Sequence, residues 1–260
     1  MRPRLLTLLA VFAGLLIAPL GAASADWRDE GPRTLVMTYR VAPGDRTQFR
    51  DAVRASTLPR LETLRAAGEL ADYHVLVNRY VDAASWDMML ILTFRVPPDL
   101  AHWRSVEEVA PAGLPPGALK LVSQVETAPG DMMRRKAASP RPGDPPPVYL
   151  VVPYDYLVST DDYLAYVDGY LLPQVDGWIE EGALSSYGLF LPRYAAGRWW
   201  SSLLVLAYRG DEGLARRDAV VAKIRARLAA SPEWSKWAEN KTKLRVEKEP
   251  MVADELAPGR

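Results

Sequence analysis

The side chains in this sequence that could carry acid–base chemistry are few. The chain contains two histidines, His74 and His102, and no cysteine. His74 lies in a strand-like segment, where alternation places it on one face with Leu76, Asn78 and Tyr80. We therefore predict that His74 acts as a catalytic acid or base on a small organic molecule, with Tyr80 as a second catalytic group. The alternative is a histidine that only hydrogen-bonds within a sheet.

The expected ligand-binding residues lie largely on the same face. A hairpin that pairs Val81 with Trp86 would bring Asp87, Met89 and Thr93 onto the histidine's face of the next strand. This face is more polar than its reverse, so we expect it to line an internal space while the reverse face meets helices. The predicted ligand-binding residues are Asn78, Met89, Thr93 and Tyr194.

The motifs of several other reaction classes are absent from the sequence. No serine-hydrolase elbow, HExxH zinc motif, P-loop or dinucleotide-binding glycine motif occurs in a usable context. The acidic pairs, such as Glu107-Glu108 and Asp161-Asp162, have no histidine or cysteine beside them and are typical of solvated helix faces. We therefore expect no metal site, no cofactor and no serine or metal hydrolysis.

Nearly the same segment occurs twice in the chain. The stretch from Thr34 to Arg95 aligns without a gap to the stretch from Val148 to Arg209, at an offset of 114 positions. Between positions 58 and 95, 11 of 38 residues are identical, where ordinary composition would give roughly 2 or 3. The sequence therefore contains a duplicated unit.

The duplication divides the candidate site unevenly. The position of His74 holds Gly188 in the second copy, so one pocket could be open while Phe190 and Tyr194 fill the other. The repeated pair Arg79 and Arg193 could bind a carboxylate or the carbonyls of its own hairpin, and duplication favours the scaffold role. Repeated tryptophans are most simply core residues; Trp234 and Trp237, which belong to one copy, could pack the domain end or bind a ligand.

Each copy predicts the same order of elements. A strand, a helix, two strands, a second helix and a last strand give the β-α-β-β-α-β ferredoxin-like unit. A proline inside the first helix, Pro59 or Pro173, should kink it, and Gly68 or Gly182 should end it in a left-handed turn. The predicted strands are 35–41, 73–81, 86–95 and 121–127 in the first copy and 149–156, 187–194, 199–209 and 244–248 in the second.

The central strands explain why the unit appears twice. The segments Met88–Leu92 and Leu203–Leu206 are apolar on both faces, so helices on one face would leave the other face bare. Two sheets that pack face to face cover each other. We predict an α+β fold of two tandem ferredoxin-like units, packed sheet to sheet as a pseudo-twofold α+β barrel.

This pattern, with its shared Leu-Pro, Gly, Tyr and Trp, resembles the dimeric α+β barrel superfamily in a tandem single-chain form. It is similar in pattern to the antibiotic-biosynthesis-monooxygenase, EthD-like and NIPSNAP-like branches. The resemblance implies two ferredoxin-like units that pack sheet on sheet. Members of the superfamily include cofactor-free oxygenases, isomerases, haem enzymes and proteins without a known reaction, and no catalytic residue is matched.

The N-terminus has the pattern of an export signal. Arg2 and Arg4 precede an apolar run over 5–17, and Ala23-Ser24-Ala25 provides a cleavage site after Ala25. We predict a signal peptide over 1–25, units over 26–136 and 148–260, and a proline-rich linker over 137–147. The basic run at 132–136 lies beside that proline-rich stretch and is itself expected to be a solvated linker.

These features define the expected setting and function. Cleavage would leave a periplasmic or secreted protein of net charge −2 that has no stable membrane anchor and no cationic face for nucleic acid. We expect a monomer or homodimer that binds a small apolar or aromatic molecule. The alternatives are a cofactor-independent oxygenase or isomerase and a non-catalytic structural or assembly module. An open lumen with His74 inside would favour the enzyme, and a closed lumen the module.

Overall fold

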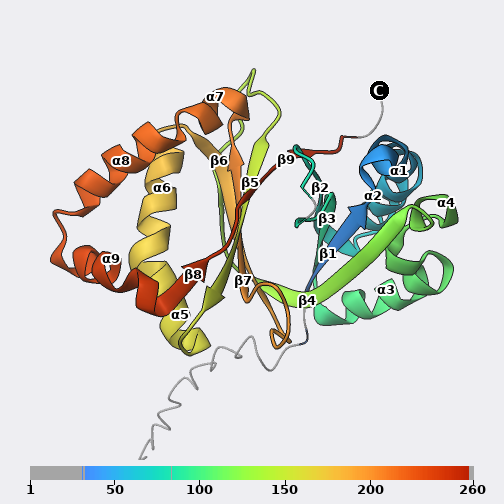
Figure 1. Cartoon of the computed structure of the whole chain (residues 1–260), viewed down its shortest axis with the longest axis horizontal. Helices are drawn as coiled ribbons and strands as arrows, with labels where there is room; N and C mark the ends of the chain where they lie inside the picture. The colour runs from blue at the N-terminus through green and yellow to red at the C-terminus, as the bar shows by residue number, and fades with distance from the viewer. Residues whose placement is uncertain (1–30, 32, 83, 258–260) are drawn as a thin grey trace, which may run out of the picture. The chain divides into compact units, whose positions relative to one another are not determined.

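The structure, a computed structural model, describes residues 31, 33–82 and 84–257. These residues form the compact unit shown in Figure 1, in which two layers of strands face each other and each carries helices on its outer side. The expected signal peptide, 1–25, lies outside the described residues. No helix in the described part of the chain is long and apolar enough to cross a membrane.

Both halves follow the predicted β-α-β-β-α-β order, which confirms the predicted α+β class, and the second half has an additional helix and an additional strand. In the first half, the strands are β1 (Thr34–Val41), β2 (Leu70–Asn78), β3 (Met88–Phe94) and β4 (Val122–Ala137), and the helices are α1 (Arg46–Ala52), α2 (Leu58–Ala66), α3 (Pro97–Val109) and α4 (Pro116–Leu119). In the second half, the strands are β5 (Val148–Tyr156), β6 (Leu184–Pro192), β7 (Ser202–Tyr208), β8 (Arg245–Glu247) and β9 (Met251–Glu255), and the helices are α5 (Thr160–Tyr166), α6 (Leu172–Glu180), α7 (Gly210–Ala215), α8 (Arg217–Leu228) and α9 (Pro232–Leu244).

The two sheets join at their edges into a closed antiparallel barrel. The strands follow one another in the order β1, β3, β2, β9, β5, β7, β6 and β4, and β4 pairs again with β1. The short β8 pairs with β5 only. Strands β4 and β9 each pair with both halves, so they form the two seams between the units. Closure removes the exposed sheet edges that each unit would have alone.

Hydrophobic residues pack in three clusters, two beneath the helices and one inside the barrel. Val75, Leu90 and Leu92 pack under the helices of the first half, whereas Leu76, Met89 and Ile91 belong to the interior cluster. The predicted assignment of the two faces of β2 and β3 is therefore confirmed. The interior cluster also contains residues of β5, β7 and β9, so each half covers the apolar sheet face of the other.

The first helix of each half is interrupted just before its proline. Residues Val53–Thr57 and Val167–Leu171 form single π-helical turns, closed by bonds from the N–H groups of Leu58 and Leu172 to the carbonyls five residues earlier. Proline lacks an N–H group and its ring clashes with the carbonyl four residues earlier, and the wider turn relieves this clash. The sequence predicted this interruption at Pro59 and Pro173 as a kink.

Both helices end at the predicted glycine. Gly68 has φ +82° and Gly182 has φ +74°, and each begins the paired hydrogen bonds of a Schellman motif. A Cβ at either position would meet only an arginine side chain, at 3.7 Å and 3.5 Å, so the backbone conformation rather than space requires glycine.

We expect Gly68→Ala and Gly182→Ala each to lower the free energy of unfolding by about 1 kcal/mol or more, because alanine is strained at positive φ. Urea unfolding of each variant measures this effect. Gly44→Ala is the matched control, since Gly44 has open space around it and no positive φ. Equal stability of all three variants would contradict the assigned helix caps.

Two predictions about the strands are wrong. The basic run at 132–136 is not a solvated linker, because β4 continues to Ala137 and pairs with β6. The β2–β3 hairpin pairs Val77 with Met88 rather than Val81 with Trp86. The Asn78 amide donates to the carbonyl of Trp86 at 3.0 Å and stabilises the turn, so β2 ends at Asn78 rather than at Val81. A shift of two residues preserves the face of each side chain, so the interior set survives the error.

The repeated arginines stabilise the two seams. Arg79 follows β2 and pairs with Asp254 of β9, and Arg193 follows β6 and pairs with Asp131 of β4. The backbone N–H groups of both arginines also donate across their seams, to Val252 O at 2.8 Å and Pro129 O at 2.9 Å. Each arginine therefore joins its own half to the last strand of the other half, which supports the scaffold role rather than ligand binding.

Candidate functional site

Three consecutive strands of the barrel bring together one polar cluster at the first seam. His74 of β2 lies beside Glu255 of β9, and Tyr149 of β5 completes the group. His74 Nδ1 is 2.8 Å from Glu255 Oε1, and the Tyr149 hydroxyl donates to Glu255 Oε2 at 2.8 Å. The same hydroxyl is 3.4 Å from His74 Nδ1. Glu255 thus orients both neighbouring side chains.

Electrostatics favour the charged form of this pair. Burial opposes a charged imidazole, but the hydrogen bond and negative charge of Glu255 outweigh it and raise the pKa of His74 above 6.5. Burial of Glu255 acts in the opposite direction from its contacts with His74 and Tyr149, which prevail and lower its pKa below 4.5. Burial, followed by the charge of Glu255, raises the pKa of Tyr149, so its hydroxyl remains a donor.

The cluster forms one wall of a cavity of about 150 Å³ inside this mouth of the barrel. The imidazole of His74 is 34% exposed there, so a bound molecule could reach it. The apolar part of the lining consists of Ile91, Met132, Phe190, Val205 and Ala207. A lining with both polar and apolar residues suits a small organic molecule with one polar end.

Arg135 of β4 adds a positive charge to the cavity. Its neighbour Lys136 pairs with Asp176 at 3.1 Å, but no carboxylate in the described part of the chain pairs with Arg135. The charge of Arg135 acts on His74 and opposes protonation of the imidazole. The cavity therefore contains a cation that an acidic group of a ligand could meet.

The structure brings together some of the predicted site residues and separates others. Thr93 lines the cavity with His74, and Met89 is buried in the barrel interior nearby. The amide of Asn78 instead bonds within the β2–β3 turn, to Ser85 and Trp86. Tyr80 and Tyr194 are 62% and 69% exposed and do not line this cavity. Phe190, rather than Tyr194, covers the Gly188 position in the second half.

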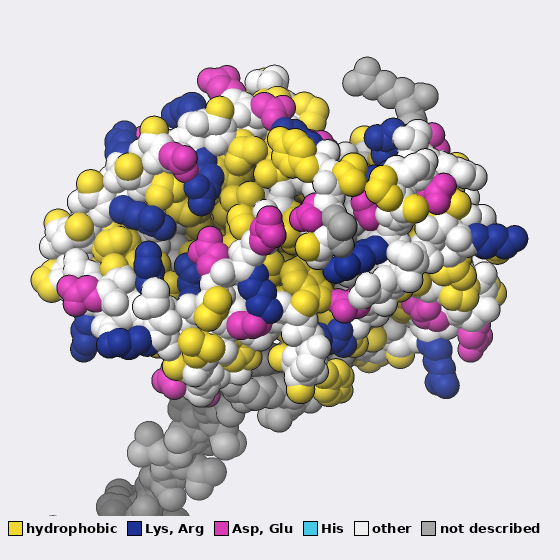
Figure 2. Space-filling view, viewed as in Figure 1, with side chains coloured by type: hydrophobic (Ala, Val, Ile, Leu, Met, Phe, Trp, Pro, Cys, Tyr) yellow, Lys and Arg dark blue, Asp and Glu magenta, His cyan; other side chains and the backbone are white. Residues whose placement is uncertain are grey.

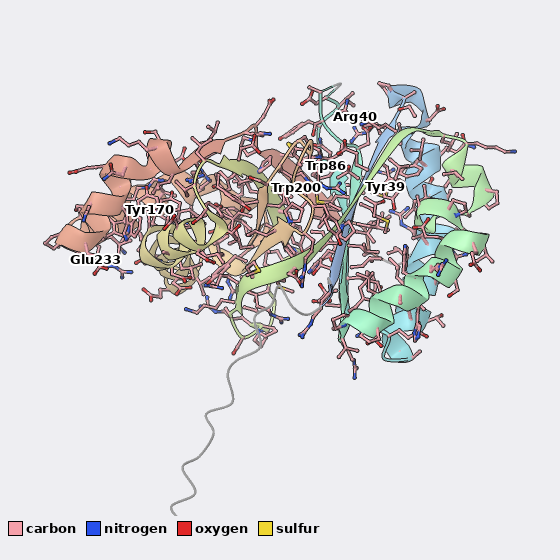
Figure 3. All side chains as sticks on the ribbon, turned by 90° about the horizontal axis from the view of Figure 1, so that it is seen from below. Tyr39, Arg40, Trp86, Tyr170, Trp200 and Glu233 are labelled. Carbon is pink, nitrogen blue, oxygen red and sulfur yellow. The ribbon has the colours of Figure 1, made fainter. Side chains whose placement is uncertain are left out.

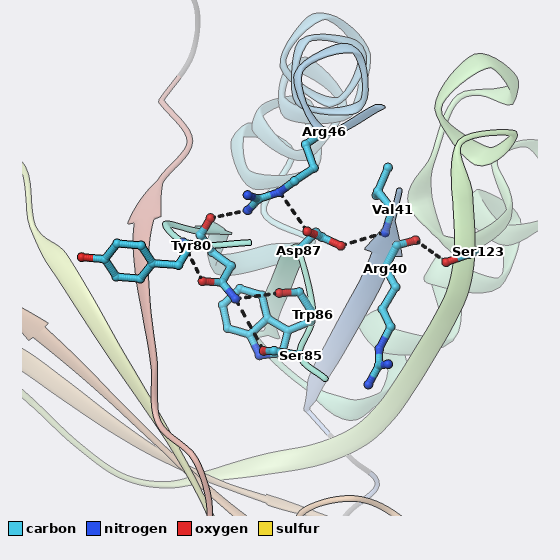
Figure 4. Close-up of polar contacts among 9 residues, drawn as sticks. Arg40, Val41, Arg46, Tyr80, Ser85, Trp86, Asp87 and Ser123 are labelled. Atoms are coloured by element: carbon cyan, nitrogen blue, oxygen red, sulfur yellow. Dashed lines mark hydrogen bonds and ion pairs between the residues drawn. The ribbon is translucent and has the colours of Figure 1, made fainter. Parts of the chain in front are cut away.

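Asp87 does not face the lumen, so the inward orientation predicted for it from the sequence is wrong. Figure 4 shows it between helix α1 and strand β1, and Tyr80 turned away from this group. Arg46 Nε lies 2.8 Å from Asp87 Oδ1, and the N–H of Val41 donates to Oδ2 at 2.8 Å. The alternation that predicted an inward side chain applies only inside the strand, and β3 begins one residue later, at Met88. Asp87 is a structural anchor for α1.

Sequence reasoning missed Glu255, Tyr149 and Arg135. Arg135 was interpreted as part of a linker, and Glu255 lies in a strand that the repeat did not predict. The aligned counterpart of Tyr149 is Leu35, so the repeat does not single out this tyrosine. A usable signal was the break in symmetry itself, because polar residues that replace apolar counterparts in one half mark the place where the halves differ in function.

The space between the sheet and the helices of the second half is filled by aromatic residues. Tyr170 stacks on Tyr166 at 5.2 Å and on Trp234 at 5.0 Å between ring centroids. The indole N–H of Trp234 donates to the Tyr170 carbonyl at 3.2 Å. Trp234 therefore packs the domain, one of its two predicted alternatives.

Charges of both signs are interspersed over the face shown in Figure 2, and hydrophobic side chains gather toward its middle, where the strands run in Figure 1. Among the described residues, no group of three His, Asp or Glu side chains is placed to hold a metal ion.

Comparison with known proteins identifies the fold. No family model and no curated protein matches the sequence. A proposed monooxygenase from Lactobacillus acidophilus is similar in structure, with 12% identity, a TM-score of 0.55, and 88% of this chain and 95% of that chain covered. A second proposed monooxygenase, from Fusobacterium nucleatum, has 9% identity and a TM-score of 0.54, with 88% and 94% covered. An anthrone oxidase-like protein has 11% identity and a TM-score of 0.52, with 87% and 92% covered. The chain has the dimeric α+β barrel fold, here with both ferredoxin-like units in one chain.

Proposed function

We propose that this chain is an exported binding protein that holds a small apolar or aromatic molecule with one acidic oxygen inside its barrel. The observation that carries the proposal is the His74 cavity, in which apolar side chains of β3, β4, β6 and β7 accompany the polar cluster of His74, Glu255 and Tyr149. Arg135 provides charge for the acidic oxygen, and the apolar walls provide area for the rest of the ligand.

The name of one structurally similar protein agrees with an aromatic ligand. Two are proposed monooxygenases and one is anthrone oxidase-like, and an anthrone is an aromatic ketone. At 9 to 12% identity these names support the class of ligand for this chain only as a proposal.

We expect benzoate and 2-naphthoate to bind with dissociation constants on the order of 1 mM or tighter, and their neutral amides to bind more weakly. Isothermal titration measures the constants, and native mass spectrometry of the protein from an exporting host tests for a retained ligand. Arg135→Gln should weaken binding of the acids about tenfold, because it removes the unpaired cation.

The control is His102→Gln, because His102 is 63% exposed and does not line the cavity. This variant should bind the acids like the parent protein. If neither a retained ligand nor saturable binding of any probe is found, the binding proposal fails and the non-catalytic structural module is favoured.

A second candidate, a cofactor-independent oxygenase or isomerase, is favoured by the contact between His74 and Glu255. Both activities could start when a base removes a proton from a bound molecule. If Nδ1–H donates to Glu255, Nε2 has the free lone pair, and Glu255 holds the imidazole in that tautomer. Tyr80 is 62% exposed and does not line the cavity, so it does not assist this proton transfer. The phenol beside His74 is that of Tyr149.

A further inference from the structure

A second cavity, of about 230 Å³, opens at the other mouth of the barrel. Strands β4 and β5 contribute to both cavities, from different ends. Glu126 and Pro153 line the second cavity, whereas Arg135 and Tyr149 line the first. Because barrel strands run from mouth to mouth, the two cavities lie at opposite mouths. Nothing in the proposed function uses the second one.

Aromatic and apolar side chains form the inner wall of the second cavity. Trp86, Trp199 and Met251 line it, and Trp200 packs edge-on against Trp199 with ring centroids 6.3 Å apart. Figure 3 shows Trp86 and Trp200 close together between the strands of the two halves, and both belong to the interior cluster. Trp86 and Trp200 occupy equivalent places in the repeat, so the duplication itself concentrates indole rings at this mouth.

The cations around this cavity are already engaged. The guanidinium of Arg40 donates to the Ala84 carbonyl at 3.0 Å, and the ammonium of Lys248 pairs with Asp155 at 2.7 Å. The carboxylate of Glu126 differs, because it has no hydrogen bond or ion pair with any residue that the structure describes. Glu126 is half-buried, and the neighbouring Ala128 lies in the interior cluster on the same strand face.

An indole wall beside an uncompensated carboxylate matches the chemistry of an organic cation. The faces of tryptophan rings attract cations, and this attraction is strongest where water is excluded. We propose that the second mouth binds a small organic cation, namely a quaternary ammonium group with a short apolar or hydroxyl-bearing chain. The Trp86 and Trp199 side chains contact the methyl groups of the cation, and Glu126 provides the countercharge. The two mouths of the barrel then select ligands of opposite charge.

The experiment compares choline with 3,3-dimethylbutan-1-ol, which has the same shape but a neutral carbon in place of the nitrogen. The protein is titrated with each compound while the indole N–H signals are followed by ¹H–¹⁵N NMR. We expect saturable binding of choline with shifts of the Trp199 signal, and binding of the alcohol that is at least about tenfold weaker. Equal binding of the two probes, or no saturable choline binding, overturns the proposal.

Two variants locate the site. Glu126→Gln and Trp199→Leu should each weaken choline binding about tenfold or more, and Glu108→Gln, on the exposed side of α3, should leave it unchanged. If choline affinity survives both substitutions, the proposal is wrong. Should a variant fail to fold, the comparison of choline with the alcohol in the unaltered chain still decides. The proposal is independent of the proposed function, because benzoate titration reports on the other mouth alone.

Discussion

Asp131→Ala is expected to lower the free energy of unfolding by about 3 kcal/mol, because it removes the buried carboxylate that pairs with the guanidinium of Arg193. Arg193 Nε is 2.6 Å from Asp131 Oδ2, and the two side chains are only 12% and 11% exposed. Arg193 also donates to the Gly31 carbonyl at 3.1 Å, but a neutral carbonyl does not replace a carboxylate. Urea unfolding followed by circular dichroism measures the loss.

The repeat offers a matched control at the other seam. Asp254→Ala removes the partner of Arg79, but Asp254 is 51% exposed and Arg79 has a second carboxylate partner in Asp211. Solvent and the second partner compensate, so we expect a loss of about 1 kcal/mol or less. The double variant Arg193→Met with Asp131→Leu should recover most of the stability lost in Asp131→Ala, because no buried charge is left unpaired. Equal losses at the two seams would contradict a buried, closed barrel at β4 and β6.

The order of elements and the interior faces of β2 and β3 could be predicted because both depend on local chemistry. Strand periodicity, the helix-ending glycines and the prolines act over a few residues, and the repeat supplied a second copy of each signal. Gly68 and Gly182 illustrate this, since their positive φ follows from the helix end alone. Even the wrong hairpin register kept Leu76, Met89 and Ile91 on the interior face, because the error was two residues.

The site could be predicted only in part because it depends on the seam. His74 and Glu255 are 181 residues apart, and they meet because β9 adds to β2 across the two halves. The β-α-β-β-α-β pattern places strands within a unit and gives no register between units. Arg135 was not identified from the sequence for a related reason. Lys136 of β4 pairs with Asp176 of helix α6 and Arg135 lines the cavity, so this segment lacks the hydrophobic alternation of an ordinary strand.

His74→Gln is expected to reduce turnover of a substrate bound in the first cavity by about 10²- to 10⁴-fold, because glutamine cannot accept a proton at neutral pH. The substrate to assay is the compound that native mass spectrometry finds in the purified protein. Binding of benzoate should change little, since Arg135 and the apolar walls remain. His102→Gln should retain full activity, as the second histidine lies far from the cavity lining.

The pH profile separates a catalytic base from a residue that only supports the fold. A base acts in its neutral form, so the rate should rise with pH through the pKa of His74. Glu255, together with Asp72, whose Oδ2 is 3.9 Å from His74 Nε2, raises this pKa above 6.5. Glu255→Gln removes the main charge that raises this pKa and leaves burial, which lowers it, so the rising limb should move to lower pH. Glu255 is a positioning residue, and loss of the preferred tautomer should also reduce the rate on the plateau. An unchanged profile in Glu255→Gln, or full turnover in His74→Gln, would leave the cavity as a binding site without this chemistry.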